Sequence, residues 1–196
     1  MQTRSRSGST ERSSWSAHLP AVVAADVQRR RAEILAQAWG RVLDLDEPGA
    51  VDALVAASVG ASDELATGSP AGQYDTIVST GRLIDLADLP AAVRGLRQLL
   101  AADGELHVVE PVNRPGSQGL LESSLGALLP AVAGLHLGRD VVRVLRSERL
   151  AVIDLDRFTI ATAVWPLRRF VQARAVRLES FDPGTSRVNA DFGMSS

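Results

Sequence analysis

The chain has 196 residues, of which 45% are hydrophobic and 22% are charged, and its formal net charge is -2. This length suits one domain that buries about two thirds of the surface that its unfolded chain would expose. The balance of apolar and charged residues excludes a wholly disordered chain, and the small negative charge argues against nucleic acid as a partner. The absence of cysteine excludes disulfides and thiolate zinc sites, which fits a cytoplasmic protein.

The two ends of the chain carry no helical or strand period. Residues 1–16 are rich in serine and arginine, so we expect a disordered tail there, without the apolar run of a signal peptide. No stretch approaches the roughly 18 apolar residues that a membrane-spanning helix needs. We therefore place a single domain at residues 17–178 and a flexible C-terminal tail at residues 179–196.

Helices and strands alternate along the domain. The first helix is expected from about Pro20 to Trp39, because apolar positions recur there at helical spacing and Gly40 follows. Strands are expected at 41–45, 74–79, 105–109, 150–155 and 170–178, and further helices at 50–59, 89–100, 120–133 and 140–147. Asp103-Gly104 is interpreted as the turn that closes the helix before the third strand. This alternation predicts an α/β domain with a mainly parallel sheet covered on both faces.

Three segments in the same order resemble class I S-adenosylmethionine-dependent methyltransferases. Residues 40–45 (GRVLDL) are similar to the opening strand of that family, 74–80 (YDTIVST) to its fourth strand, and 96–110 (LRQLLAADGELHVVE) to the following helix, turn and fifth strand. Residues 136–140 and 158–177 resemble the C-terminal parts of its small-molecule members of the quinone and lipid type. The resemblance implies a Rossmann-like methyltransferase fold and S-adenosylmethionine as cofactor.

The cofactor half of the fold is shortened relative to that family. The family's glycine-rich turn is Asp46-Glu47-Pro48-Gly49 here, and its two carboxylates would face the cofactor's methionine carboxylate unless a cation intervenes. Only 24 residues separate Gly49 from Tyr74, whereas two strands with their helices take roughly 50 to 60. We expect a sheet of about five strands that ends in an antiparallel C-terminal strand, with no side chain assigned to the ribose or the adenine.

Loss of two strands would leave the first strand at the edge of the sheet, with a row of unpaired backbone groups. The N-terminal helix, the loop at residues 60–73 or a second subunit are the candidates to cover it. We predict a homodimer.

The resemblance implies cofactor contacts at five positions. They follow the first and fourth strands, at the carboxyl edge where open α/β sheets place ligands: Asp44, Gly49, Ser79, Thr80 and Gly81. The alternative is that Asp44 is an ordinary carboxylate at a strand end, and that the residues after the fourth strand are there because a turn needs small side chains.

Substrate contacts are expected at Glu110, His136 and Arg139. Glu110 follows the fifth strand, and the alternative role for it is turn capping. His136 and Arg139 lie three residues apart before a helix, so both can reach one anionic or polarised substrate atom. They are alternatively a helix-start pair in which Asp140 answers Arg139. His107, inside the fifth strand, is predicted to pack with a hydrogen bond rather than to take part in chemistry.

Three possibilities remain from this sequence. The first is an S-adenosylmethionine-dependent methyltransferase acting on a small molecule. The second is a catalytically inactive homologue that serves as a binding or scaffold protein for a protein partner or a hydrophobic ligand. An unrelated α/β binding module is a third possibility. No metal site is expected, since the three histidines lie far apart and no ligand cluster surrounds them.

Overall fold

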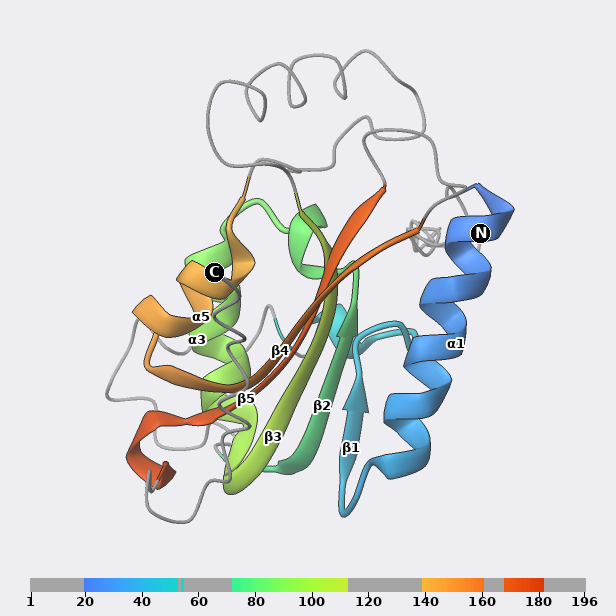
Figure 1. Cartoon of the computed structure of the whole chain (residues 1–196). Coiled ribbons are helices and arrows are strands. Elements are labelled where there is room, and N and C mark those ends of the chain that lie inside the picture. Colours follow the sequence, from blue (N-terminus) through green and yellow to red (C-terminus); the bar gives the residue numbers. More distant parts are fainter. Residues whose placement is uncertain (1–19, 53, 55–71, 113–138, 161–167, 182–196) are drawn as a thin grey trace, which may run out of the picture.

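A five-stranded sheet forms the centre of the protein (Figure 1), with the strand order β1-β2-β3-β5-β4. The computed structural model describes residues 20–52, 54, 72–112, 139–160 and 168–181. The strands are β1 (Val42–Asp44), β2 (Tyr74–Thr80), β3 (Leu100–Pro111), β4 (Leu150–Thr159) and β5 (Arg169–Arg177). The α-helices are α1 (Ala21–Gln37), α3 (Leu89–Leu99) and α5 (Val141–Ser147), and the short 3-10 helices are η2 (Leu83–Asp85) and η4 (Leu178–Ser180).

Strand direction confirms the predicted sheet. β1, β2 and β3 pair in parallel, whereas β5 pairs antiparallel with both β3 and β4. The last strand of the chain is therefore the antiparallel one, inserted between β3 and β4. Because β1, β2 and β3 run in the same direction, their carboxyl ends meet at one edge of the sheet, here called the carboxyl edge.

Helices cover both faces of the sheet, as Figure 1 shows: α3 and α5 lie together on one side and α1 lies on the other. Helix α1 buries Val23, Val27 and Ile34, which recur at helical spacing. Full burial of one such aliphatic side chain stabilises the fold by roughly 1.5 to 3 kcal/mol. These buried side chains anchor α1 against β2 and β3. The same packing brings the turn of α1 between Val27 and Ile34 to the carboxyl edge.

A row of buried side chains crosses the sheet from β1 to β5. Leu43 pairs with Ile77, Ile77 with Leu106 and Leu106 with Ala175. All four side chains are buried in the core. Because side chains alternate between the two faces of a strand, this row sets the register that carries Asp44 and Thr80 to the same edge.

Two boundaries differ from the sequence-based expectation. Asp103 and Gly104 lie within β3 instead of forming a turn, because α3 ends at Leu99 and the strand begins directly after it. The pairing with β2 shifts register there, and a Cβ on Gly104 would lie 2.9 Å from the carbonyl oxygen of Tyr74. Close backbone approach, not a turn, therefore requires this glycine. Strand β4 also extends to Thr159, beyond the predicted end at residue 155, because it pairs with β5 along that length.

Several expectations concern residues outside the described ranges. They are the two tails apart from residues 179–181, most of the helix at 50–59, the loop at 60–71, the helix at 120–133 and the position of His136. Within the described ranges, none of the helices has the length and apolar character that crossing a membrane requires. The same ranges contain no group of His, Asp and Glu side chains that could hold a metal ion.

Candidate functional site

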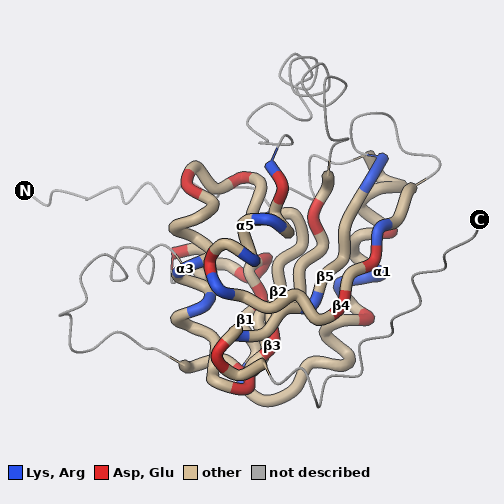
Figure 2. Tube along the Cα trace, turned by 60° about the vertical axis from the view of Figure 1, so that its left-hand side comes forward, with Lys and Arg blue, Asp and Glu red and all other residues tan. Residues whose placement is uncertain are grey.

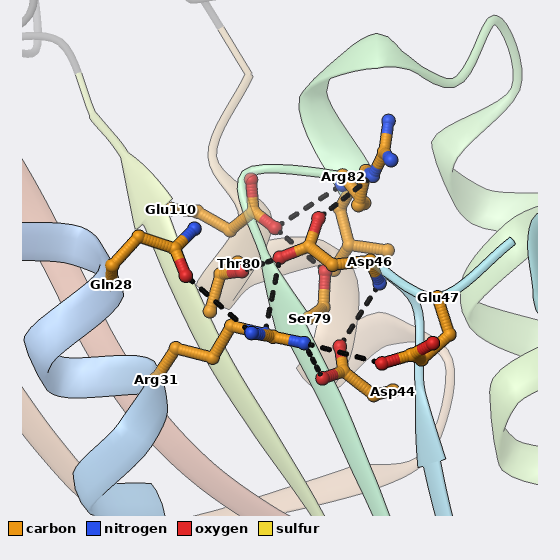
Figure 3. Close-up of polar contacts among 10 residues, drawn as sticks. Gln28, Arg31, Asp44, Asp46, Glu47, Ser79, Thr80, Arg82 and Glu110 are labelled. Atoms are coloured by element: carbon orange, nitrogen blue, oxygen red, sulfur yellow. Dashed lines mark hydrogen bonds and ion pairs between the residues drawn. The ribbon is translucent and has the colours of Figure 1, made fainter. Parts of the chain in front are cut away.

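Charged side chains from three different elements meet at the carboxyl edge (Figure 3). Asp44 ends β1, Asp46 lies in the turn that follows, Arg82 follows β2, and Arg31 comes from α1. We call Arg31, Asp44, Asp46 and Arg82 the charge cluster. Their side chains are between 7% and 21% exposed, so the cluster is largely withdrawn from solvent.

Arg31 holds the carboxyl end of β1. Its guanidinium bonds to Asp44 Oδ2, and its Nε lies 3.5 Å from Asp46 Oδ2. The second oxygen of Asp44 accepts a hydrogen bond from the backbone N–H of Asp46 at 3.0 Å. Glu47 adds an exposed carboxylate 3.8 Å from the same guanidinium. Arg31 thus bridges three carboxylates of one short segment.

Asp46 connects the turn after β1 to the end of β2. It accepts a hydrogen bond from the Thr80 hydroxyl and another from Arg82 Nε at 2.9 Å. The cation that the sequence required beside the acidic turn is therefore supplied twice, by Arg31 and by Arg82. The cluster balances two carboxylates against two guanidinium groups, and buried charges are tolerated on this condition.

Glu110 occupies the end of β3 and is fully buried. Its Oε1 accepts hydrogen bonds from Ser79 Oγ at 2.9 Å and from the backbone N–H of Leu83 at 3.2 Å. Burial raises the pKa of Glu110 to about 8, against the opposing effect of hydrogen bonds from Leu83, Ser79 and, more weakly, the backbone of Ile84. The turn-capping role weighed for Glu110 is present in the structure, since Oε1 holds the start of η2.

Two glycines shape the backbone at this edge. Gly81 follows β2 with a φ of 82°, and its N–H donates to the carbonyl oxygen of Val109 at 2.8 Å. Gly49 has a φ of 83°, and a Cβ there would meet nothing within 4 Å. Both positions need the left-handed conformation that glycine adopts without strain. Space around Gly49 leaves room for a close approach to the backbone.

Arg139 lies away from the charge cluster, at the start of α5. Its guanidinium donates to the carbonyl oxygens of Leu86 and Ala87, the latter at 2.8 Å. Asp140 does not form the ion pair with Arg139 that the alternative required. Its carboxylate instead caps α5 by accepting a hydrogen bond from the backbone N–H of Arg143. Arg139 and Glu110 therefore hold the same segment, between β2 and α3, from opposite ends.

His107 has the packing role that its place inside β3 predicted. Its Nε2 lies 3.2 Å from Glu105, which also pairs with Arg174 at 3.1 Å. Burial is the largest cause that lowers the pKa of His107, so the ring is neutral at pH 7. This arrangement lies within the strand and not at the carboxyl edge.

Sequence reasoning missed Arg31 and Arg82. A signal for Arg31 was present: Val23, Val27 and Ile34 define the buried face of α1, and position 31 lies four residues after Val27 on that same face. An arginine on a core-facing position needs a buried partner, which is Asp44. Arg82 has no comparable signal, because it follows a strand in a segment without a period.

Solved structures similar to this chain include several S-adenosylmethionine-dependent methyltransferases. These are the proteins that its sequence segments resemble. The 1,6-didemethyltoxoflavin N1-methyltransferase of Burkholderia thailandensis is 13% identical over 80% of this chain and 78% of its own, with a TM-score of 0.47. A methyltransferase of Thermotoga maritima is 11% identical over 55% of this chain and 57% of its own, with a TM-score of 0.41. An N-methyltransferase of Bradyrhizobium japonicum is 20% identical over 57% and 55%, with a TM-score of 0.36.

The chain thus spans less than two thirds of two of these three structures. No family model matches the sequence, and no curated protein matches it. Acidic and basic residues are interspersed along the described helices and strands (Figure 2).

Proposed function

We propose that this chain is an S-adenosylmethionine-dependent methyltransferase that acts on a small molecule, and that the charge cluster forms the amino-acid end of its cofactor site. The observation that carries the proposal is the pairing of Arg31 with Asp44 and of Arg82 with Asp46 at the carboxyl edge. Open α/β sheets bind their ligands at this edge.

The side chains of the cluster suit the amino-acid end of the cofactor. That end carries one ammonium and one carboxylate, so it is a zwitterion. Asp44 can accept from the ammonium, while Arg31 and Arg82 can donate to the carboxylate. Because the cluster is charge-balanced before and after such an exchange, no net charge is added to a buried place. The open space at Gly49 supports a close approach of the backbone.

The adenosine end of the proposed cofactor site is supported by fewer residues. β1 is the last strand on its side of the described sheet, and Asp63 and Glu64, the acids nearest in sequence, lie outside the described residues. When bound, S-adenosylmethionine supplies an electrophilic methyl group. The chain's own contribution would be to align the acceptor beside the carboxyl edge and to exclude water from it.

One observation favours the second candidate, a catalytically inactive homologue that binds another partner. Arg31 already satisfies Asp44, and the turn carries two carboxylates and one glycine where close approach is needed. The charged side chains of the cluster already pair with one another. A ligand would therefore stabilise the cluster only if it replaced both ion pairs.

Calorimetric titration with S-adenosylmethionine and S-adenosylhomocysteine separates the two functions. If the proposal holds, both bind, and Asp44→Asn weakens both by about tenfold, as expected for one charged hydrogen bond. Arg31→Met removes the donor proposed for the cofactor's carboxylate. Arg29→Met is its matched control, because Arg29 is on the same helix but exposed. Absence of heat at millimolar ligand would refute the proposal and leave the inactive homologue.

We also propose that a second copy of the chain covers β1. Support comes from the place of β1 at one end of the described sheet and from two apolar side chains beside it, Trp39 and Val42, which are 46% and 40% exposed. Helix α1 lies next to β1 in Figure 1, yet it leaves these two side chains accessible.

A further inference from the structure

The two carboxyl oxygens of Glu110 have different surroundings. Oε1 accepts hydrogen bonds from the Ser79 hydroxyl and the backbone N–H of Leu83. Oε2 is equally buried and has no hydrogen-bond partner among the residues that the structure describes. In Figure 3, the carboxyl oxygen of Glu110 that has no dashed line points away from Ser79. One half of this side chain is thus engaged in holding the fold, and the other half is not.

The charges around Glu110 favour its neutral form. Asp85, in η2, opposes ionisation of Glu110, and Arg82, which precedes Leu83, is already paired with Asp46. Among the described residues no cation forms an ion pair with Glu110. A buried carboxylate without a cation is costly, so the carboxyl group keeps its proton at neutral pH. Because Oε1 accepts from two donors, the proton resides on Oε2.

A buried hydroxyl donor without an acceptor costs about 1 to 3 kcal/mol. Such groups in native proteins are therefore almost always satisfied by a partner. Glu110 lies at the end of β3, next to the end of β2 and on the same edge as the charge cluster, where open α/β sheets bind ligands. An acceptor atom of a bound ligand would satisfy the donor.

We propose that Glu110 Oε2 donates a hydrogen bond to a neutral acceptor of the small-molecule substrate, either a carbonyl oxygen or an aromatic ring nitrogen. This inference rests on the proposed function, which makes the ligand a substrate. It adds the chemical class of that substrate. A cationic substrate would require Glu110 to ionise in a place that disfavours charge. An anionic substrate would bring a buried charge with no free cation beside it.

The test uses three probes of one size: benzamide, benzylammonium and benzoate. Each is titrated into protein with glutamate labelled at Cδ with carbon-13, and the Glu110 resonance is assigned by its loss in Glu110→Gln. Benzamide is expected to shift the Glu110 signal and to bind at least about tenfold more tightly than either ion, which is the worth of one well-placed hydrogen bond.

Three variants show whether the donor is responsible. Glu110→Gln places an amide N–H donor where Oε2–H was and keeps a carbonyl for Ser79, so benzamide affinity should stay within about threefold. Glu110→Met has a similar size and no donor, and should lose about tenfold. Glu105→Met, which changes an acid on the same strand away from this edge, should leave the affinity unchanged.

Tighter binding of benzylammonium than of benzamide would overturn the inference, because it would mean an ionised Glu110. Equal loss in Glu110→Gln and Glu110→Met, or no shift of the Glu110 signal with any probe, would also overturn it. Titration of S-adenosylmethionine into the same proteins keeps the two proposals apart. If benzamide binds and the cofactor does not, the proposed function fails while the donor role of Glu110 stands; the reverse result rejects only the donor role.

Discussion

Burial of Glu110 predicts a pH dependence of stability that a single substitution removes. The pKa of this carboxyl rises from 4.5 to about 8 on folding, mainly because burial disfavours its charged form. Between these two values the folded state holds a proton that the unfolded state releases. The contribution of Glu110 to the free energy of unfolding is therefore fully present below pH 4.5 and falls as pH rises toward 8.

The size of the effect follows from the two pKa values. Each unit of pH between them costs about 1.4 kcal/mol, and the loss between pH 5 and pH 7 sums to ~2.5 kcal/mol. Glu110→Gln keeps a carbonyl to accept from Ser79 and Leu83 but does not titrate. The difference in free energy of unfolding between the variant and the original protein should therefore shift by that amount in favour of the variant.

Urea unfolding at pH 5, 6, 7 and 8, followed by circular dichroism, measures this difference. All other titrating groups are shared by the two proteins, so their contributions cancel. A difference that stays constant from pH 5 to pH 8 would refute the reasoning, since it would mean that Glu110 titrates at its ordinary pKa in the folded protein. Glu105→Gln, on the same strand but partly exposed, provides the control for a general effect of removing one carboxylate.

Three further outcomes are expected. Arg31→Met should lower the free energy of unfolding by roughly 2 kcal/mol, because it leaves a buried carboxylate unpaired, whereas Arg29→Met, which removes an exposed ion pair, should have a much smaller effect in the same urea titration. Gly40→Ala should destabilise more than Gly49→Ala, since both have positive φ but only the first would place a Cβ within 2.6 Å of another side chain; equal melting temperatures would contradict this. Light scattering should find a dimer that Trp39→Glu dissociates, and a monomer at the highest concentration tested would end the homodimer proposal.

Local patterns in the sequence were sufficient for most of the fold. The helical spacing of Val23, Val27 and Ile34 located α1, and alternation of strands with helices predicted the parallel sheet. The turn assigned to Asp103 and Gly104 was wrong because turn propensity is local, whereas the close approach of Gly104 to Tyr74, where the register of β2 and β3 shifts, depends on the packing of two strands.

The candidate site divides in the same way. Asp44, Ser79, Thr80 and Glu110 could be assigned to one edge from the sequence, because each follows or ends a parallel strand and such ends meet. The ion pairs of Arg31 could not, since they depend on how α1 docks on the sheet. Nor could the raised pKa of Glu110, because it arises from burial by distant segments. Spacing along the chain decides which residues share an edge, and only packing decides which charges are buried there and which of them are paired.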